Sequence, residues 1–419
     1  MMQHKASLRI SIAIITVLLF TANCTGQYEF SLLNTVDVNG NAEMISWQHN
    51  SSYLAATNSS KRRVNFYSWN ESKLPNIITP DPVFSIETDG EPTSVSFSPD
   101  SNLAMITVLN DDQNSVGYVT AVNLTKNKYG RITAKIPVGF WPDNICVGHL
   151  GKLALVANEA EQNDETPGSI GIIDFSKSVY DGNAGIWSLH YSRLTGLEKI
   201  LALPAGLIQP EYCAMSDKDE IAAVSCQEND AVVIIDLRKE EISFAGAIKL
   251  MPASEPDGVA IIDWYDSTVQ KQGWLLGTAC EGRKQKGGKR GGQRLDFFFI
   301  WSDEDKLRWE PLISIDLPPL FENRRVDPEG IDMVLWDNKA AVFAGCEKTD
   351  AIVCILLEQN RKHQIVGIVK VGSKPEGIKA GIYDDSVIVT SANEGENGSI
   401  SICRLKKNSP KKLSKKTDK

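Results

Sequence analysis

The sequence predicts an all-β protein, a seven-bladed β-propeller closed by an N-terminal strand, and three observations lead to this prediction. A proline–acid pair recurs along the chain, and an Asn-Glu or Cys-Glu pair follows it about 17–25 residues later. Short β-branched runs separated by Gly, Pro, Asn and Asp turns fill the intervals, which is typical of strands. Counted with two looser copies, the repeat occurs seven times, and such a period indicates a repeat architecture.

Five copies of the repeat are clear and two are degenerate. The clear copies are Pro142-Asp143 with Asn158-Glu159, Pro210-Glu211 with Gln227-Glu228, Pro256-Asp257 with Cys280-Glu281, Pro328-Glu329 with Cys346-Glu347, and Pro375-Glu376 with Asn393-Glu394. The looser copies precede them and are Glu43 with Asn58, and Glu91-Pro92-Thr93 with Asn110. Four-stranded units repeated around an axis protect their edges, so a propeller explains the pattern. Helical repeats would need a 3.6-residue periodicity that the sequence lacks.

Each repeat contains the strands that a blade requires. In the third copy, strands are predicted at 144–147, 153–157 and 168–174. After the last Asn-Glu pair only one strand remains, at 399–405, so the seventh blade lacks an outer strand. Residues 28–33 precede the first blade and have no other partner. We therefore expect them to pair with the seventh blade and close the ring.

The N-terminal segment indicates a secreted, extracellular protein. Residues 1–26 combine Lys5 and Arg9 with a short apolar run and small residues, the pattern of a signal peptide. The apolar run is too short for a membrane span. The propeller is expected over 27–405 and a disordered basic tail over 406–419. The whole chain carries a net charge of −9. A second basic run, at 283–294, predicts a mobile loop, and the secretory address argues against nucleic acid as a ligand.

The sequons and the cysteines agree with an extracellular location. The predicted N-glycosylation sites are Asn50, Asn58, Asn70, Asn123 and Asn397. The eight cysteines are too sparse for a disulfide scaffold. Several of them stand at strand positions, where a buried free thiol is expected: Cys146, Cys213, Cys354 and Cys403.

Carboxylates should gather at one face of the propeller. The inner strand begins at the face where the second strand leads into the third, so both halves of the repeat are expected there, near the axis. The predicted metal ligands are Glu43, Asp143, Glu159, Glu211, Glu228, Asp257, Glu281, Glu329, Glu347, Glu376 and Glu394. So many carboxylates repel one another, and Ca²⁺ accepts irregular shells of oxygen ligands. Further neutral oxygens would come from Asn158, Asn229 and Asn393. Alternatively, the acids only cap turns and accept backbone N–H bonds.

Histidine does not join this face. The histidines of the mature chain fall at the far end of inner strands or in outer-strand segments, at His49, His149, His190 and His363. A Ser-His-Asp triad is therefore not expected. Beside the turn glutamates stand Cys226, Cys280 and Cys346. These thiols either contribute to a Cys–Glu metal site or fill the turn as small buried side chains.

These blocks resemble a known family, the choice-of-anchor I domain. The resemblance is carried by Trp141-Pro142-Asp143 with Asn158-Glu159, by Pro210-Glu211-Tyr212 with Gln227-Glu228-Asn229-Asp230, and by Asp327-Pro328-Glu329-Gly330. It implies a secreted, calcium-associated propeller glycoprotein, similar to bacterial secreted proteins and to animal mesenchyme-specific cell-surface glycoproteins linked to biomineralisation. Some relatives carry alkaline-phosphatase labels. The short chain, the basic run in blade five and Cys-Glu in place of Asn-Glu argue against a conserved enzymatic site.

Two classes of function follow. The favoured one is a non-enzymatic extracellular matrix or biomineralisation-type protein, a monomer whose acidic, calcium-binding face binds a protein, glycan or mineral. The alternative is a metal-dependent extracellular hydrolase, a phosphoesterase similar to alkaline phosphatase, in which metal-bound water attacks the ester.

Overall fold

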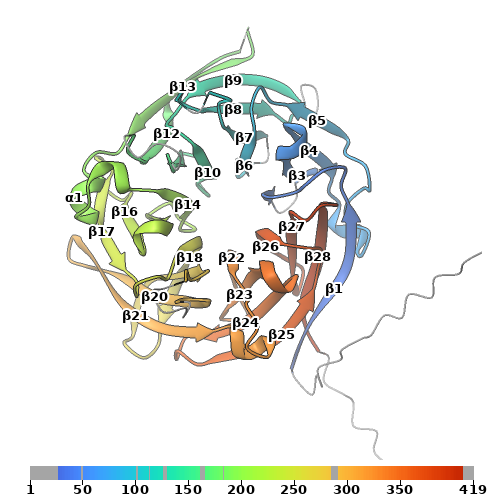
Figure 1. The fold of residues 1–419 in the computed structure, drawn as a ribbon, viewed down its shortest axis with the longest axis vertical. Coiled ribbons are helices and arrows are strands. Elements are labelled where there is room, and N and C mark those ends of the chain that lie inside the picture. Colours follow the sequence, from blue (N-terminus) through green and yellow to red (C-terminus); the bar gives the residue numbers. More distant parts are fainter. Residues whose placement is uncertain are drawn as a thin grey trace, which may run out of the picture.

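The computed structural model describes residues 27–48, 51–100, 102–112, 114–125, 130–160, 166–182, 184–284 and 291–408. Over these ranges the chain forms seven four-stranded antiparallel sheets that surround a central axis like the blades of a propeller (Figure 1). The predicted fold is therefore confirmed. Several predictions lie outside the described residues: the signal peptide, the sequon at Asn50, His49, residues 285–290 of the basic run, and the tail beyond residue 408.

In six blades the strands follow one another outward from the axis in sequence order, and in the seventh the outermost strand is the N-terminal β1 (Tyr28–Asp37). Blade one contains β2 (Ile45–Trp47), β3 (Tyr53–Asn58), β4 (Arg63–Ser68) and β5 (Phe84–Glu87). Blade two contains β6 (Pro92–Phe97), β7 (Leu103–Val108), β8 (Tyr118–Asn123) and β9 (Arg131–Pro137). Blade three contains β10 (Pro142–Val147), β11 (Leu153–Asn158), β12 (Ser169–Asp181) and β13 (Ile186–Arg193). Blades four and five are β14 (Pro210–Met215), β15 (Ile221–Cys226), β16 (Ala231–Asp236) and β17 (Ser243–Lys249); and β18 (Pro256–Asp266), β19 (Lys271–Cys280), β20 (Arg294–Asp303) and β21 (Lys306–Asp316). Blades six and seven are β22 (Pro328–Trp336), β23 (Lys339–Cys346), β24 (Ala351–Glu358) and β25 (His363–Lys370); and β26 (Pro375–Tyr383), β27 (Ser386–Asn393), β28 (Ser399–Lys407) and β1 (Tyr28–Asp37).

Short helical turns connect the strands. The elements are α1 (Leu197–Leu201) and the 3₁₀ turns η1 (Ser59–Lys61), η2 (Glu71–Lys73), η3 (Ala205–Leu207), η4 (Gln227–Asn229), η5 (Pro318–Phe321) and η6 (Glu347–Thr349). Three of these turns, η1, η4 and η6, stand between the second and third strands of their blades. They therefore occupy the position at which the sequence places the second half of the repeat.

The middle strands of the blades are buried on both faces because neighbouring blades pack against each other. Every residue of β15 and β16 is buried, whereas the outer strand β17 is mostly half-buried or exposed. Hydrophobic clusters cross blade boundaries: Trp264 and Phe299 of blade five share a cluster with Val342 and Ile355 of blade six. The continuous apolar runs of the sequence are thus strands that are covered on both sides.

The N-terminal strand closes the ring, as predicted. β1 pairs antiparallel with β28, from Tyr28 opposite Lys407 to Asp37 opposite Ser399. The Tyr28 hydroxyl also donates a hydrogen bond to Asp337 of blade six at 2.8 Å. The pairing is longer than the sequence predicts: β1 continues beyond residue 33 to Asp37, and β28 continues to Lys407, inside the segment 406–419 that is expected to be a basic tail.

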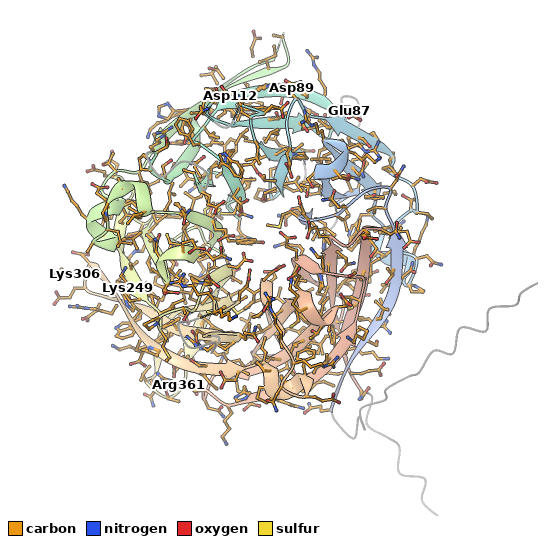
Figure 2. All side chains as sticks on the ribbon, viewed as in Figure 1. Glu87, Asp89, Asp112, Lys249, Lys306 and Arg361 are labelled. Carbon is orange, nitrogen blue, oxygen red and sulfur yellow. The ribbon has the colours of Figure 1, made fainter. Side chains whose placement is uncertain are left out.

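Polar contacts join blades at the inner and outer strands. The Trp47 indole in blade one donates to Thr390 in blade seven at 2.9 Å. Farther out, Arg361 of blade six pairs with Asp266 of blade five at 2.8 Å, and Figure 2 shows Arg361 on the outer circumference. These bonds connect neighbouring blades both near the axis and at the circumference.

Candidate functional site

The two halves of each repeat meet at one end of the inner strand. In the five blades that carry a proline–acid pair, the proline that begins the inner strand pairs with the residue that ends the second strand: Pro142 with Asn158, Pro210 with Cys226, Pro256 with Cys280, Pro328 with Cys346, and Pro375 with Asn393. The acid after each proline and the acid in each following turn therefore lie at the same face. This arrangement is the one that the sequence predicts.

The chain enters four inner strands through an unfavourable backbone conformation. The residue before the proline has a positive φ at Trp141 (48°), Glu255 (46°), Asp327 (43°) and Lys374 (56°). Positive φ is uncommon for residues with side chains. Proline itself suits the first position of a strand, since it has no N–H to pair. Such conformations persist where the surroundings fix them, which is common at functional sites.

Aspartates at the ends of two turns hold these strained residues. Asp230 follows η4 with φ 48°, and its carboxylate accepts the N–H groups of Ala253 (2.8 Å) and Glu255 (3.0 Å). Asp350 follows η6 with φ 47° and accepts the N–H of Lys374 at 3.1 Å. Each aspartate thus fastens its own turn to the start of the next blade. Turn capping by acids does occur here, at residues that the sequence analysis did not select.

The selected carboxylates converge closely enough to raise one another's pKa. Burial and then neighbouring carboxylates raise the pKa of Glu43 and Glu281 to about 8 and that of Asp257 to about 7. The predicted ligands linked in this way, called the acidic funnel below, are Glu43, Asp143, Glu159, Glu211, Asp257, Glu281, Glu329, Glu347, Glu376 and Glu394. Like charges held close together disfavour ionisation. Of the predicted ligands, only Glu228 stands apart from this set.

Glu211 is an unsatisfied member of the acidic funnel. Its Oε2 atom is buried and has no hydrogen-bond partner among the described residues. Burial, followed by the charges of Asp257 and Glu159, holds the pKa of Glu211 well above its ordinary value. A buried acceptor without a donor costs about 1–3 kcal/mol. A proton or a cation at this oxygen would offset that cost.

Glu329 and Glu347 form an acid–carboxylate pair. Burial and then the charge of Glu376 hold the pKa of Glu329 well above its ordinary range. Burial alone would raise the pKa of Glu347 too, but Lys348, a hydrogen bond from Glu329 and Lys374 together lower it. Lys374 lies 3.4 Å from Glu347 and 3.1 Å from Glu394, and so bridges blades six and seven. One side of the acidic funnel is therefore partly neutralised by fixed cations.

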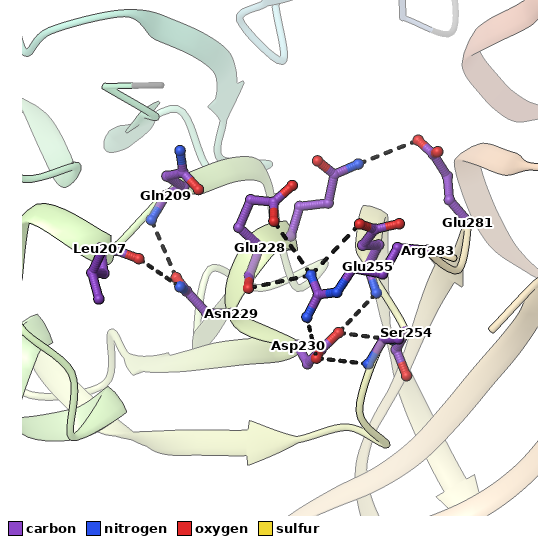
Figure 3. A network of polar contacts seen from close by, with 11 residues as sticks. Leu207, Gln209, Glu228, Asn229, Asp230, Ser254, Glu255, Glu281 and Arg283 are labelled. Carbon is purple, nitrogen blue, oxygen red and sulfur yellow. Dashed lines mark hydrogen bonds and ion pairs between the residues drawn. The ribbon is translucent and has the colours of Figure 1, made fainter. Parts of the chain in front are cut away.

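Glu228 belongs to a different network, shown in Figure 3. Arg283 lies 3.3 Å from Glu228, 2.8 Å from Asp230 and 3.5 Å from Glu255, so one guanidinium serves three carboxylates. The Glu228 side chain is about half exposed (49%). Its expected place among the cation ligands is therefore not supported: an arginine already compensates its charge, and its side chain extends into solvent. Glu281, in the equivalent turn of blade five, instead accepts a hydrogen bond from Gln227 at 3.2 Å.

The chemistry of the acidic funnel fits a hard cation, but the described side chains do not form a ready-made coordination sphere. Carboxylate oxygens suit Ca²⁺, and Glu211 has an oxygen without a partner. However, no three His, Cys, Asp or Glu side chains in the described ranges are placed to hold one metal ion. A cation bound here would keep part of its water shell or draw side chains inward.

The turn cysteines are buried fillers. Cys226, Cys280 and Cys346 are fully buried. The Cys280 thiol contacts Asp296 at 3.7 Å, and the Cys346 thiol contacts the carbonyl of Ala344 at 3.8 Å. Burial comes first among the causes that raise the pKa of all three thiols. A Cys–Glu metal site is therefore not assembled from these residues.

The asparagines that end the second strands hold loops in place. Asn158 is fully buried; it accepts the N–H of Gly139 at 2.9 Å and donates to the Ser169 carbonyl at 3.1 Å. Asn393 is equally buried and donates to the Ser399 carbonyl at 2.9 Å. A Cβ atom on Gly139 would lie 2.3 Å from the Asn158 side chain. Both asparagine side chains are thus engaged with nearby backbone, and the expectation that these amides add oxygens to a cation shell stays a prediction.

The side-chain amides of two further asparagines also bind nearby backbone. Asn229 accepts the N–H of Gln209 at 3.2 Å and donates to Leu207 at 2.6 Å (Figure 3). Asn58 is fully buried, and its Nδ2 atom, which would carry a glycan, donates to Asn39 at 2.9 Å. The predicted glycosylation at Asn58 does not fit the folded structure. At the other described sequons, Asn397 is exposed, and Asn70 and Asn123 are half-buried; these sites stay predictions.

A cavity of about 470 Å³ continues along the axis from the acidic funnel, lined by the inner strands of all seven blades. His149 lies at its far end, exposed, and its backbone donates to Asp219 at 2.7 Å. His190 and His363 belong to the outer strands β13 and β25. Within the described residues, histidine is thus placed away from the acidic funnel.

Sequence reasoning missed several charged residues of this face. Glu91 helps to raise the pKa of Glu43, while Asp327 and Glu255 do so for Glu281. All three acids directly precede the proline of an inner strand. The position before each of these prolines could have been selected from the sequence. Acids at this position lie at the same face as the acidic funnel, and in several blades the backbone there has a positive φ.

Comparisons with known proteins agree with this geometry. Residues 43–249 match the choice-of-anchor I domain. This range covers the first four blades and supports the family that the sequence resembles. The domain indicates a cell-surface or extracellular protein. No curated protein matches the chain. In the part of the chain that the structure describes, no helix has the length and apolar character needed to cross a membrane.

Solved structures similar to this chain are propellers or contain comparable folds. Hydrazine synthase of Kuenenia stuttgartiensis matches with a TM-score of 0.57 and 14% identity, over 87% of this chain and 96% of that one. The β-propeller domain of Cps50 (Swd1) from Myceliophteria thermophila matches with 0.57 and 11%, over 90% and 99%. The periplasmic gluconolactonase PpgL of Pseudomonas aeruginosa matches with 0.54 and 13%, over 88% and 94%. At these identities the likeness shows the fold alone.

Proposed function

We propose that this chain is a secreted propeller glycoprotein that binds Ca²⁺ in its acidic funnel and uses the loaded face to hold an extracellular ligand. The ligand class is a protein, glycan or mineral surface of the matrix or biomineralisation type. The choice-of-anchor I match supports an extracellular or surface location. The resemblance to mesenchyme-specific cell-surface glycoproteins supports the finer assignment.

One observation carries the proposal: carboxylates from most blades face each other with raised pKa values, and Glu211 keeps a buried oxygen without a donor. A folded protein that only needed turn caps would not bring these side chains together. Divalent cations remove the repulsion and supply a partner for Glu211 at once. Bound cations would also reverse the local sign of the face, so that sulfated glycans or phosphate-bearing mineral could dock.

Several observations favour binding over hydrolysis. Hydrolysis needs a positioned base, an activated water or nucleophile, and a cation for the developing charge. Among the described residues the nearby cations are already engaged: Arg283 with Glu228, Asp230 and Glu255, and Lys374 with glutamates of blades six and seven. The described histidines lie at the far end of the axial cavity or on outer strands. Binding requires none of these groups.

Calcium titration tests the proposal. Purified protein freed of metal with a chelator should bind Ca²⁺ in calorimetry, and a hundredfold excess over the dissociation constant should stabilise the fold by about 2.7 kcal/mol. Glu211→Gln combined with Asp257→Asn should weaken binding at least tenfold, since it removes two charges at the unsatisfied oxygen. Glu228→Gln is the matched control, because Arg283 already compensates that carboxylate, and it should bind as the wild type does.

Two results would reject the proposal. One is wild-type protein whose melting curve is the same in chelator and in excess Ca²⁺. The other is turnover of a chromogenic phosphate ester by the metal-loaded wild type that disappears in the Glu211→Gln, Asp257→Asn variant. The second result would establish the hydrolase alternative instead.

A further inference from the structure

Two cysteines of neighbouring blades face the axial cavity together. Cys146 lies on the inner strand of blade three and Cys213 on the inner strand of blade four, and both line the cavity of about 470 Å³. All seven described cysteines are free thiols in the structure. Cys146 is half-buried and so accessible from the cavity, whereas each of the other six is buried. The pair thus combines one accessible thiol with one buried thiol.

The packing places the two side chains against each other. Cys146 packs on the hydrophobic cluster that contains Cys213, Leu155 and Met215. The backbone N–H and the thiol of Cys213 both donate to the Asn144 side chain, each at 3.3 Å, which fixes Cys213 beside the strand that carries Cys146. Burial and then a hydrogen bond between the two thiols hold the pKa of Cys213 well above its ordinary value.

We propose that Cys146 and Cys213 form a disulfide that links the inner strands of blades three and four when the protein enters an oxidising compartment. The proposal rests on the secretion that we propose above, because cytosolic thiols stay reduced. It adds a covalent modification site that is independent of the acidic funnel, and it revises the expectation that both thiols remain free.

The reaction is a thiol–disulfide exchange with a small disulfide such as oxidised glutathione. The Cys146 thiolate attacks one glutathione sulfur, forms a mixed disulfide and releases one glutathione thiolate. The Cys213 thiol loses its proton and attacks the Cys146 sulfur, which forms the protein disulfide and releases the second glutathione. Two protein thiols are oxidised and one glutathione disulfide is reduced to two glutathione molecules. The accessible thiol reacts first because the oxidant reaches it through the cavity.

The other cysteines provide an internal control. Cys354 and Cys403 share a hydrophobic cluster between blades six and seven, but both are fully buried. A small oxidant has no comparable route to them. They should therefore remain thiols under conditions that oxidise the pair in the axial cavity.

Peptide mapping tests this proposal. The full chain is equilibrated with oxidised and reduced glutathione, unfolded in the presence of an alkylating agent without reductant, and digested. We expect the peptides of Cys146 and Cys213 to be joined, to separate on reduction, and to be 2 Da lighter than the two free peptides together. Cys354 and Cys403 should be alkylated. Alkylation of both cavity cysteines, or a stable glutathione adduct on Cys146 alone, would overturn the proposal.

A stability measurement supplements the map. The disulfide would close a loop of roughly 70 residues, so reduction should lower the melting temperature by about 5 °C. In Cys146→Ser the melting temperature should no longer depend on reductant, and Cys213 should be alkylated. The wild-type map decides the proposal even if this variant does not fold. Because the oxidation is carried out without calcium, failure of the calcium proposal leaves the result interpretable.

Discussion

Freed of cations, this protein should be more stable at pH 5 than at pH 7. Burial and mutual repulsion raise the pKa of Glu43 and Glu281 to about 8 and of Asp257 to about 7 in the folded chain. In the unfolded chain these groups ionise near their ordinary values, around pH 4. The folded state therefore binds more protons between these limits. The stabilisation that these bound protons provide is complete below about pH 4, and it is lost as the pH rises through 7 and 8.

The size of the effect follows from proton linkage. One proton held by the folded chain and released by the unfolded chain changes the free energy of unfolding by about 1.4 kcal/mol per pH unit. In addition to burial, Asp257 raises the pKa of Glu281, and Asp143 raises the pKa of both Asp257 and Glu43, so the three carboxyls do not titrate independently. We therefore count one proton between pH 5 and 7, which gives about 3 kcal/mol. A propeller of roughly 380 residues has an unfolding entropy near ~0.8 kcal/mol/K. The melting temperature should then fall by about 4 °C.

Calorimetric melting in chelator at several pH values measures this change. Glu281→Gln removes one of the raised carboxyls, so its melting temperature should equal that of the wild type at pH 5 and exceed it at pH 7. Glu228→Gln changes the equivalent turn of blade four, where Arg283 compensates the charge. Its melting temperature should depend on pH as that of the wild type does. A wild-type melting temperature that is constant or rises between pH 5 and 7 would refute the reasoning.

Two further predictions concern closure and compensation. Deletion of residues 27–37 removes three buried hydrophobic side chains from the seventh blade, about 6 kcal/mol at roughly 2 kcal/mol each, and bares the edge of β28. We expect light scattering to show aggregation; a monomeric product that melts as the wild type does would contradict this. Arg283→Gln leaves its three carboxylate partners uncompensated, so it should lower stability in chelator by about 1–2 kcal/mol and tighten Ca²⁺ binding in calorimetry. Unchanged stability and affinity would show that the guanidinium compensates little.

The fold was predictable because its markers are local and repeated. A proline at the start of a strand and an acid turn at the end of the next strand recur with constant roles, and in the structure the two markers pair directly, as at Pro328 and Cys346. Counting the markers therefore counts the blades. The closing strand was also predictable, since the seventh blade lacked one strand and residues 28–33 had no other partner.

The details of the site depend on contacts that sequence patterns do not encode. Glu228 and Glu281 stand in equivalent turns, yet one is held in solvent by Arg283 and the other faces the acidic funnel. Arg283 follows Glu281 by two residues but reaches back to the previous blade. Similarly, an Asn-Glu pair does not reveal that Asn158 turns inward to hold Gly139 while Glu159 joins the carboxylates. Side-chain direction at a turn is set by the neighbouring blade.

The pairing of β1 with β28 determines how the ring would respond to force. The two strands are antiparallel, and their ladder begins with Tyr28 opposite Lys407. Tension applied to the chain before residue 28 and after residue 407 would act on that first pair alone, so the hydrogen bonds would break one after another, as in a zipper, and not together in shear. If the protein bridges two anchored structures, the seventh blade should open at low load while the other six stay folded. The ring would then lengthen under tension and close again when the tension is released.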